Sequence, residues 1–471
     1  MVHHGSMEVR GSNPPHSEHY NRGKFGRLFP NLHPFARDTP QIREALGELG
    51  RKGGVMDGGS VVPPGNPQNP DNPARLTAGF TFLGQFLDHD MTFDPTSSLE
   101  QQNDPEAIAN FRTPLLELDS LYGSGPRASA HLYDVSTPGK LLIDAAAPRD
   151  VPRNSQLRAL IGDPRNDENV IVSQLHLAFV KFHNAVLAQV ISKGQTPPGG
   201  AFEEAQRIVR WHYQWMVVHE FLPHIVGEGR VKDLMRSHRE RRYFRWRHEP
   251  FIPVEFAVAA YRFGHSQVRQ AYVANQGFIA PIFNAAVQNT NPDPEDLRGG
   301  KRADRRFVNW NGFFSIVPGG PVQLSHRIDT KLSGALFELP FNAPGLPSAN
   351  PASLAQRNLL RGLVFGLPSG QALARAMRIT PLTSDDLGDV RHAELRSSTP
   401  PWFYMLREAD KCENGARLGP VGGRIVAEVF LGVLEGDRHS YLRADPDWKP
   451  HLGDKPGEFT IVDLLKVAGV V

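Results

Sequence analysis

The chain has a single cysteine, Cys412, in 471 residues, which excludes an intrachain disulfide framework. It has no run of about 18 consecutive apolar residues, so we expect no membrane-spanning helix. Its charge is balanced, with 52 Lys and Arg residues against 50 Asp and Glu, and this gives no reason to expect nucleic acid as a partner. The sequence also contains no CxxC pair, HExxH, GxGxxG or P-loop motif, so zinc and nucleotide chemistry are not indicated.

The N-terminal stretch is polar and has no apolar core. Residues 1–27 therefore do not resemble a Sec-type signal peptide, and we expect a cytoplasmic or a non-classically exported protein. Hydrophobic residues make up 40 % of the chain, which is enough for a large core. The 40 Pro and 44 Gly residues predict many ordered loops between the elements of that core.

The stretch at residues 82–93 is mostly apolar, which predicts a buried helix. Gln85, Asp88 and His89 would lie on one face of that helix, because residues three and four apart are neighbours. Asp90 would point about 100° away from His89 and serve a different neighbour. Buried polar groups need partners, so the pattern fits either a polar contact that fixes a core helix or a reactive site.

The stretch at residues 113–119 has oxygen-bearing side chains at alternate positions. If it is extended, Thr113, Leu115, Glu117 and Asp119 face one way and present a hydroxyl, a backbone carbonyl and two carboxylates. Oxygen ligands of this kind suit calcium, and Asp90 could add another. A solvated loop with two acidic residues is the alternative interpretation.

A polar turn at residues 162–169 precedes a long apolar helix predicted over residues 170–192. Arg165 and Glu168 would therefore lie at the start of a buried helix. A second long helix is predicted from about Phe202 to Leu222.

A buried helix is also predicted over residues 253–268, and it contains Gly264 directly before His265. Glycine is unfavourable in a helix interior by about 1 kcal/mol relative to alanine, so a flat group close to the backbone could explain it. A metal-binding histidine and a satisfied core histidine both remain open for His265. A further helix is predicted to end at Gly366.

Together these segments resemble the animal-type haem peroxidases of the peroxidase–cyclooxygenase superfamily, and most closely its compact microbial members. The resemblance covers roughly residues 26–445 and rests on four motifs in order: Gly84–Asp90, Gly162–Glu168, Tyr261–His265, and Asn358 with the stretch up to Pro368. It implies a mainly α fold with little or no β-sheet. We expect a single large helical domain over residues 26–471 with long ordered loops, preceded by a polar tail at residues 1–25 that can be disordered.

The resemblance also implies a cofactor, haem b, and residues that hold it. His265 would be the axial iron ligand, and Asn358 would accept a hydrogen bond from its ring N–H. Arg262 would pair with a haem propionate. Asp88 and Glu168 occupy the positions of the carboxylates that form ester links to haem in mammalian members.

On the other side of the haem, the resemblance implies that His89 is the acid–base group of peroxide cleavage. Gln85 would lie beside it, near the peroxide or halide, and Arg165 would stabilise negative charge. The family's calcium site would fall on Asp90, Thr113, the Leu115 carbonyl, Glu117 and Asp119, although Glu117 and Asp119 depart from the usual Asp and Ser.

The expected function is that of a haem-dependent peroxidase, which uses hydrogen peroxide to oxidise a halide, thiocyanate or a small organic donor. Asn169 replaces the methionine that bonds a haem vinyl group in some mammalian members, so no sulfonium link is expected. A fatty-acid dioxygenase is an alternative, but Arg262 occupies the position of its radical tyrosine and Tyr261 lies one residue earlier. A peroxinectin-like adhesion protein is a further alternative, and no Arg-Gly-Asp tripeptide supports it.

Overall fold

The computed structural model describes residues 25–59, 71–92, 114–194, 200–236, 242–246, 249–284, 293–300, 303–339 and 351–471. The chain is 48 % helix and 6 % strand, which confirms the predicted mainly α fold. Most of the predicted tail at residues 1–25 lies outside the described residues, so its division from a domain at residues 26–471 stays a prediction.

The α-helices are α2 (Pro40–Gly50), α3 (Ala78–Met91), α4 (Asp119–Tyr122), α5 (Gly125–Ala128), α6 (Val170–Ser192), α7 (Ala201–Met216), α8 (Leu222–Val226), α9 (Glu228–Arg236), α10 (Gly264–Gln267), α11 (Leu354–Val364), α12 (Gly370–Ala376), α13 (Ala393–Ser397), α14 (Pro401–Glu413), α15 (Pro420–Gly436), α16 (Tyr441–Ala444) and α17 (Ile461–Val467). The 3₁₀ segments are η2 (Ala130–Leu132), η3 (Pro164–Asp167), η7 (Ala260–Phe263), η8 (Trp310–Gly312) and η9 (Gly334–Phe337), and the π-helical segments are η4 (Val217–Phe221) and η6 (Glu255–Ala259).

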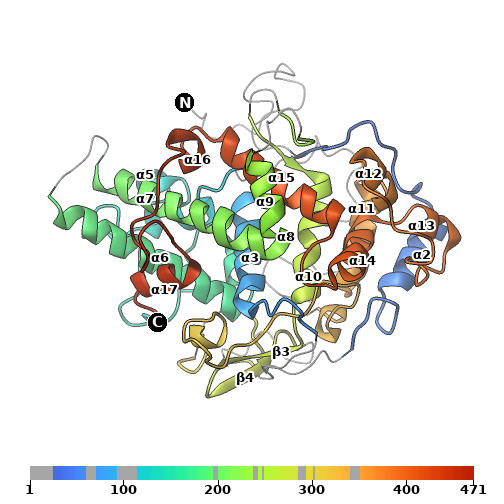
Figure 1. Cartoon of the computed structure of the whole chain (residues 1–471). Helices are drawn as coiled ribbons and strands as arrows, with labels where there is room; N and C mark the ends of the chain where they lie inside the picture. Colours follow the sequence, from blue (N-terminus) through green and yellow to red (C-terminus); the bar gives the residue numbers. More distant parts are fainter. Residues whose placement is uncertain are drawn as a thin grey trace.

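The described strands form two small sheets. β1 (Phe25–Gly26) pairs in parallel with β2 (Ile252–Pro253), and β3 (Ala271–Asn275) forms an antiparallel hairpin with β4 (Phe278–Pro281). The hairpin lies at one edge of the molecule, below the helices in the view of Figure 1. Little β-sheet was predicted, and the structure confirms it.

Helix α3 lies at the centre of the molecule and is buried along most of its length (Figure 1). It begins at Ala78 and ends at Met91, earlier at both ends than the predicted helix at residues 82–93, and Phe93 lies outside the described residues. Its first N–H group is satisfied from outside the helix, since Ala78 N donates to Gln323 O at 2.8 Å. The segment around residue 323 therefore fixes where α3 starts.

Helix α6 has the bounds that the sequence predicts. It starts after Asn169, whose side chain accepts a hydrogen bond from Val172 N at 2.9 Å and caps the helix. Among the described residues, α6 is the one helix long and apolar enough to cross a membrane, yet 83 % of its most apolar 18-residue window is buried inside the protein. It packs against α3, α7 and α17, so it forms part of the core.

The predicted buried helix at residues 253–268 is helical over residues 255–267, but the prediction of a single helix is wrong. The segment consists of β2, the π-helical η6, the 3₁₀ segment η7 and the short α10, and the backbone turns at Ala259, with φ −127° and ψ −74°. The buried carboxylate of Glu255 accepts hydrogen bonds from Leu28 N at 2.9 Å and Phe29 N at 3.1 Å. These distant contacts tie the segment to the chain beside β1, and a helical pattern in the sequence does not reveal them.

The predicted extended stretch at residues 113–119 is also wrong where it is described, and Thr113 lies outside the described residues. Residues 114–117 form bends, Leu118 has a left-handed backbone with φ +63°, and Asp119 begins α4. The side chains of alternate residues in this stretch therefore do not all point to the same side of the backbone.

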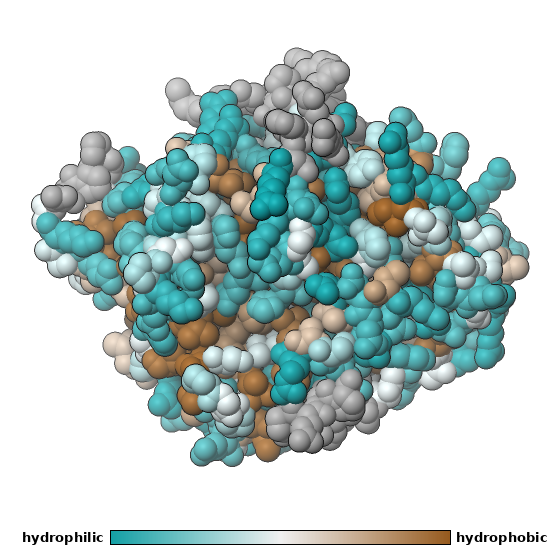
Figure 2. Space-filling model, in the orientation of Figure 1, coloured by the Kyte–Doolittle hydropathy of each residue, from teal (hydrophilic) through white to brown (hydrophobic). Residues whose placement is uncertain are grey.

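The core is continuous from one end of the described chain to the other. Buried apolar residues from Phe25 to Ala468 form one contact cluster. On the face shown in Figure 2, apolar side chains lie in small groups between hydrophilic ones. Apolar groups scattered in this way are normal for a protein surface.

Candidate active site

A cavity of about 290 Å³ lies between α3 and the segment formed by η7 and α10. Its walls are largely aromatic and aliphatic, and polar side chains enter it from α3, from the η3 turn and from the η7–α10 segment. These polar residues include Gln85, Asp88, His89, Arg165, Glu168, Arg262 and His265. The three polar residues predicted to share one face of the α3 helix therefore do meet at one cavity.

Gln85 links α3 to the start of α6. Its side-chain Nε2 donates a hydrogen bond to Glu168 Oε1, and its Oε1 accepts one from Asn169 Nδ2 at 3.2 Å. Burial raises the pKa of Glu168 to about 7, although Arg165 and Gln85 act in the opposite direction. The Glu168 carboxyl group is therefore partly protonated near neutral pH.

His89 is held in one tautomer by a hydrogen-bonded chain. His89 Nδ1 lies 2.8 Å from Asn166 Oδ1, and Asn166 Nδ2 lies 3.1 Å from His176 Nδ1. An amide oxygen only accepts, so His89 Nδ1 carries the proton and Nε2 has the free lone pair. Burial, followed by the charge of Arg165, lowers the pKa of His89 to about 4, so its ring is neutral near neutral pH.

Arg165 is fixed by its neighbours. Its Nε and Nη2 donate to the fully buried Asp163 carboxylate at 3.1 and 2.9 Å, and Nη2 also donates to the backbone carbonyls of His89 and Thr92. Burial, the largest single effect, lowers the pKa of Arg165, but the charge and hydrogen bond of Asp163 together with the charges of Asp88 and Glu168 exceed it, and the pKa is raised. The cavity therefore has a permanent cation beside His89.

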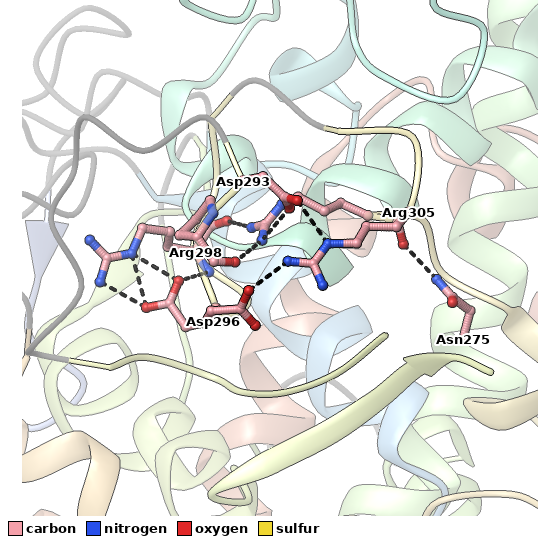
Figure 3. A network of polar contacts seen from close by, with 8 residues as sticks. Asn275, Asp293, Asp296, Arg298 and Arg305 are labelled. Carbon is pink, nitrogen blue, oxygen red and sulfur yellow. Dashed lines mark hydrogen bonds and ion pairs between the residues drawn. The ribbon is translucent and has the colours of Figure 1, made fainter. Parts of the chain in front are cut away.

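The η3 turn is held from outside by residues 293–300. Gly299 N donates to Glu168 O at 2.8 Å. Figure 3 shows the polar network that fixes this segment, in which Arg298 pairs with Asp296 at 2.7 Å and the neighbouring Arg305 makes further ion pairs. The network thereby supports the position of the turn that carries Arg165.

Across the cavity, His265 lies against Asn358 and Arg262. His265 Nδ1 is 2.8 Å from Asn358 Nδ2, while Asn358 Oδ1 accepts a hydrogen bond from Arg262 Nη1 at 3.0 Å. The predicted pair of His265 and Asn358 is thus brought together. The direction differs from the prediction, because the amide oxygen faces Arg262 and its nitrogen faces the histidine.

His265 is suited to bind a metal through its other ring nitrogen. Burial, followed by the charge of Arg262, lowers its pKa to about 3, so the ring is neutral. Metal ligation through Nε2 requires a neutral imidazole with its proton on Nδ1. The Asn358 nitrogen faces Nδ1 here, so the amide must turn its oxygen toward the ring when His265 binds a metal. A Cβ built on the adjacent Gly264 would meet no atom within 4 Å, so the described chain leaves open space there.

Tyr261 also lines this cavity. Its hydroxyl donates to Gly84 O of α3 at 3.1 Å, and its ring stacks on Phe256 with a centroid distance of 4.8 Å. Burial raises its pKa well above the ordinary value. The structure therefore connects the two sides of the cavity through this tyrosine.

The predicted calcium site stays a prediction, since Thr113 lies outside the described residues. Asp90 Oδ2 accepts from Leu118 N and from Tyr213 Oη, each at 3.1 Å, so Asp90 does serve a different neighbour from His89. Glu117 lies 3.9 Å from the guanidinium of Arg210. The described part of the chain contains no group of three or more His, Cys, Asp or Glu side chains able to hold a metal.

Sequence reasoning gave no role to Asn166, His176 or Asp163. Asp163 had a recognisable signal, because an Asp before a proline at a helix start is typical of a cap, and its Oδ1 accepts from Arg165 N at 2.9 Å. The pairing of Asn166 with His176 had no such signal, since it depends on how the η3 turn packs on α6.

The fold and the cavity define a helical protein with a neutral imidazole on each side of an apolar pocket. The family model for animal haem peroxidase matches residues 96–398, and the chain belongs to this family. Family membership implies that the chain binds haem.

The chain is similar to larger animal proteins. It is 23 % identical over 365 residues to peroxidasin homolog pxn-2 of Caenorhabditis elegans, covering 70 % of this chain and 26 % of that protein. It is 23 % identical over 373 residues to thyroid peroxidase of Mus musculus, covering 71 % and 39 % of the two chains. The match thus spans well under half the length of these relatives.

Two solved structures share the fold. Peroxidase A from Dictyostelium discoideum has a TM-score of 0.61 at 18 % identity, covering 89 % of this chain and 88 % of that chain. The fatty acid alpha-dioxygenase of Oryza sativa has a TM-score of 0.59 at 14 % identity, covering 96 % of this chain and 79 % of that chain. At these identities the likeness concerns the fold.

Proposed function

We propose that this chain is a haem-dependent peroxidase that uses hydrogen peroxide to oxidise a halide, thiocyanate or a small organic donor. The observation that carries the proposal is one apolar cavity with His265 on one side and the pair of His89 and Arg165 on the other. The residues fit haem b, because His265 is neutral, open space faces Gly264, and Nε2 becomes free for iron once the Asn358 amide turns its oxygen toward Nδ1. Arg262 lines the same cavity and would face a haem propionate.

When bound, haem supplies the redox-active iron at which peroxide is reduced and a donor is oxidised. The Nε2 atom of His89 accepts the first proton of hydrogen peroxide, and the same atom then returns that proton to the departing oxygen. Asn166 keeps the proton of His89 on Nδ1, so Nε2 stays available as the base. Arg165 stays charged throughout and stabilises the negative charge that develops on the departing oxygen.

Asp88 and Glu168 line the cavity and would form ester bonds to the haem, as the family resemblance implies. Glu168 is oriented by its hydrogen bond to Gln85. After cycles of peroxide turnover, we expect part of the haem to remain with the protein on extraction under denaturing acid. Release of all the haem in that extraction would exclude the ester bonds and leave the peroxidase proposal intact.

A fatty-acid dioxygenase is the second candidate, and the position of Tyr261 in the cavity wall supports it. A radical mechanism needs a tyrosine that can lose its proton, but the Tyr261 hydroxyl contacts a backbone carbonyl and its pKa is raised by burial. These features favour the peroxidase. Oxygen uptake with an unsaturated fatty acid, without added peroxide, would favour the dioxygenase.

The test is the absorption spectrum of the haem-loaded chain before and after a small excess of hydrogen peroxide. We expect a Soret band that shifts with peroxide and recovers with iodide. His89→Ala and Arg165→Ala should each slow the peroxide-dependent shift by about 10²-fold or more, as expected for positioned acid–base and charged groups. His265→Ala should lose the haem. An unchanged spectrum in His265→Ala, or wild-type rates in the other two variants, would contradict the proposal.

A further inference from the structure

A second cavity, of about 470 Å³, shares Phe80 in its wall with the proposed haem cavity. It is formed by the stretch before α3, by η4 and α8, by residues 314–315 and by the chain around α17. Its volume falls within the range of roughly 300–1,000 Å³ that small-molecule sites occupy. Phe80 lines both cavities, so the two cavities are neighbours that share this residue in their walls.

The wall nearest the haem cavity is aromatic. The ring of Phe80 lies 4.6 Å from the imidazole of His224 and 5.6 Å from the ring of Phe314, measured between centroids. All three side chains line the second cavity. Edge and face contacts of this kind suit a planar aromatic ligand.

The charged residues of the cavity are largely engaged with one another. Lys455 pairs with Glu458 at 3.4 Å, and Lys466 pairs with Asp454. Asp463 accepts from Thr460 as the cap of α17. Because these charges compensate, the cavity offers little attraction to a strongly charged ligand.

Two polar groups beside the aromatic wall have capacity left for a ligand. Glu220 Oε2 accepts from Ile461 N at 2.7 Å, and its Oε1 has no hydrogen-bond partner among the described residues. Within the same described ranges, the ring nitrogens of His224 make no hydrogen bond. Glu220 and His224 are four residues apart across the junction of η4 and α8, and both line the cavity.

We propose that the second cavity binds an uncharged phenol as the reducing donor, with its ring against Phe80 and its hydroxyl between Glu220 and His224. This proposal rests on the proposed peroxidase function. One hydrogen peroxide and two phenols would yield two waters and two phenoxyl radicals. Each phenol gives its electron toward the haem cavity past Phe80 and its proton to the His224 ring.

The first test blocks the second cavity and leaves the haem cavity unchanged. Ser315 is exposed and lines the second cavity, so Ser315→Trp fills it without disturbing the core. Val317 is 57 % exposed and does not line the cavity, so Val317→Trp is the matched control. On the haem-loaded full chain, Ser315→Trp should raise the calorimetric Kd for 4-methylphenol at least about tenfold, while Val317→Trp should not change it.

A second test removes the polar contacts. His224→Leu should weaken 4-methylphenol binding by about tenfold, the cost of one lost hydrogen bond, and should slow phenol oxidation. Glu220→Gln keeps an acceptor oxygen and should weaken binding less, by the loss of the carboxyl group alone. Iodide oxidation in the haem cavity should not change in these variants or in Ser315→Trp. Unchanged phenol binding in Ser315→Trp, or in both polar variants if the tryptophan variant does not fold, would overturn the second site. Absence of a Soret band and of iodide oxidation in the wild-type chain would instead overturn the proposed function.

Discussion

At the scale of the residue, the environment of His89 predicts how the reaction depends on pH. Its pKa is lowered to about 4 because the ring is buried and lies near Arg165. The neutral ring is the form that accepts the peroxide proton. Because the pKa is lowered, the ring stays neutral to a lower pH than an ordinary histidine. We therefore expect the rate constant for the reaction of the haem-loaded protein with peroxide to stay level from neutral pH down to roughly pH 5 and to fall only below it.

Stopped-flow measurement of that rate constant across the acid range is the appropriate experiment. His89→Ala supplies the baseline without the base. An inflection near pH 6.5, the ordinary value for histidine, would show that burial and Arg165 do not set the pKa of the catalytic ring.

Asn166 has a separate effect, because it determines which nitrogen of His89 carries the proton. Asn166→Val has a similar size but accepts no hydrogen bond, so both tautomers become accessible, and we expect peroxide to react about tenfold more slowly. Asn166→Asp still accepts the Nδ1 proton, and its charge should raise the His89 pKa and move the acid limb of the pH profile upward. Equal rates in the valine variant and the wild type would exclude this positioning role.

At the scale of the element, the η3 turn depends on the segment beside it. A Cβ on Gly299 would lie 1.4 Å from Asp167 O, so the two segments cannot keep their present distance if residue 299 has a side chain. We expect Gly299→Ala to lower the free energy of unfolding by about 1–3 kcal/mol and to slow the peroxide reaction, because the displaced turn carries Arg165.

Chemical denaturation of the wild-type chain and of Gly299→Ala measures this loss of unfolding free energy. Gly229→Ala in the exposed first turn of α9 is the matched control, since a Cβ there meets no atom within 4 Å. That control should be neutral or stabilising by up to about 1 kcal/mol. If both alanine variants unfold alike, close packing at residue 299 does not hold the turn.

A comparison of two elements shows what the sequence could predict. Helix α6 was predicted over its full length because its apolar repeat is uninterrupted and Asn169 caps it. The segment at residues 253–268 has an equally apolar pattern, yet it divides at Ala259. The difference lies in long-range contacts such as those of Glu255 with backbone groups more than 220 residues earlier, which local periodicity does not encode.

At the scale of the whole molecule, the candidate site is assembled from distant parts of the chain. The four motifs that mark it in the sequence meet at a single cavity or directly beside it, as Asn358 does behind His265. Their resemblance to the family's motifs was sufficient to predict which residues come together. The hydrogen-bond directions were not predictable, because the orientation of the Asn358 amide depends on where Arg262 lies in the folded protein.

This assembly predicts that haem stabilises the fold as a whole. A ligand that binds only the folded state stabilises it by about 2.7 kcal/mol when its free concentration is about 100 times Kd. We therefore expect haem to raise the Tm of the wild-type chain by several degrees, and iron-free protoporphyrin to raise it less, because only haem can bond His265. In His265→Ala the two ligands should give the same smaller shift. A larger shift with haem than with the iron-free ring in that variant would mean that the iron is held by another residue.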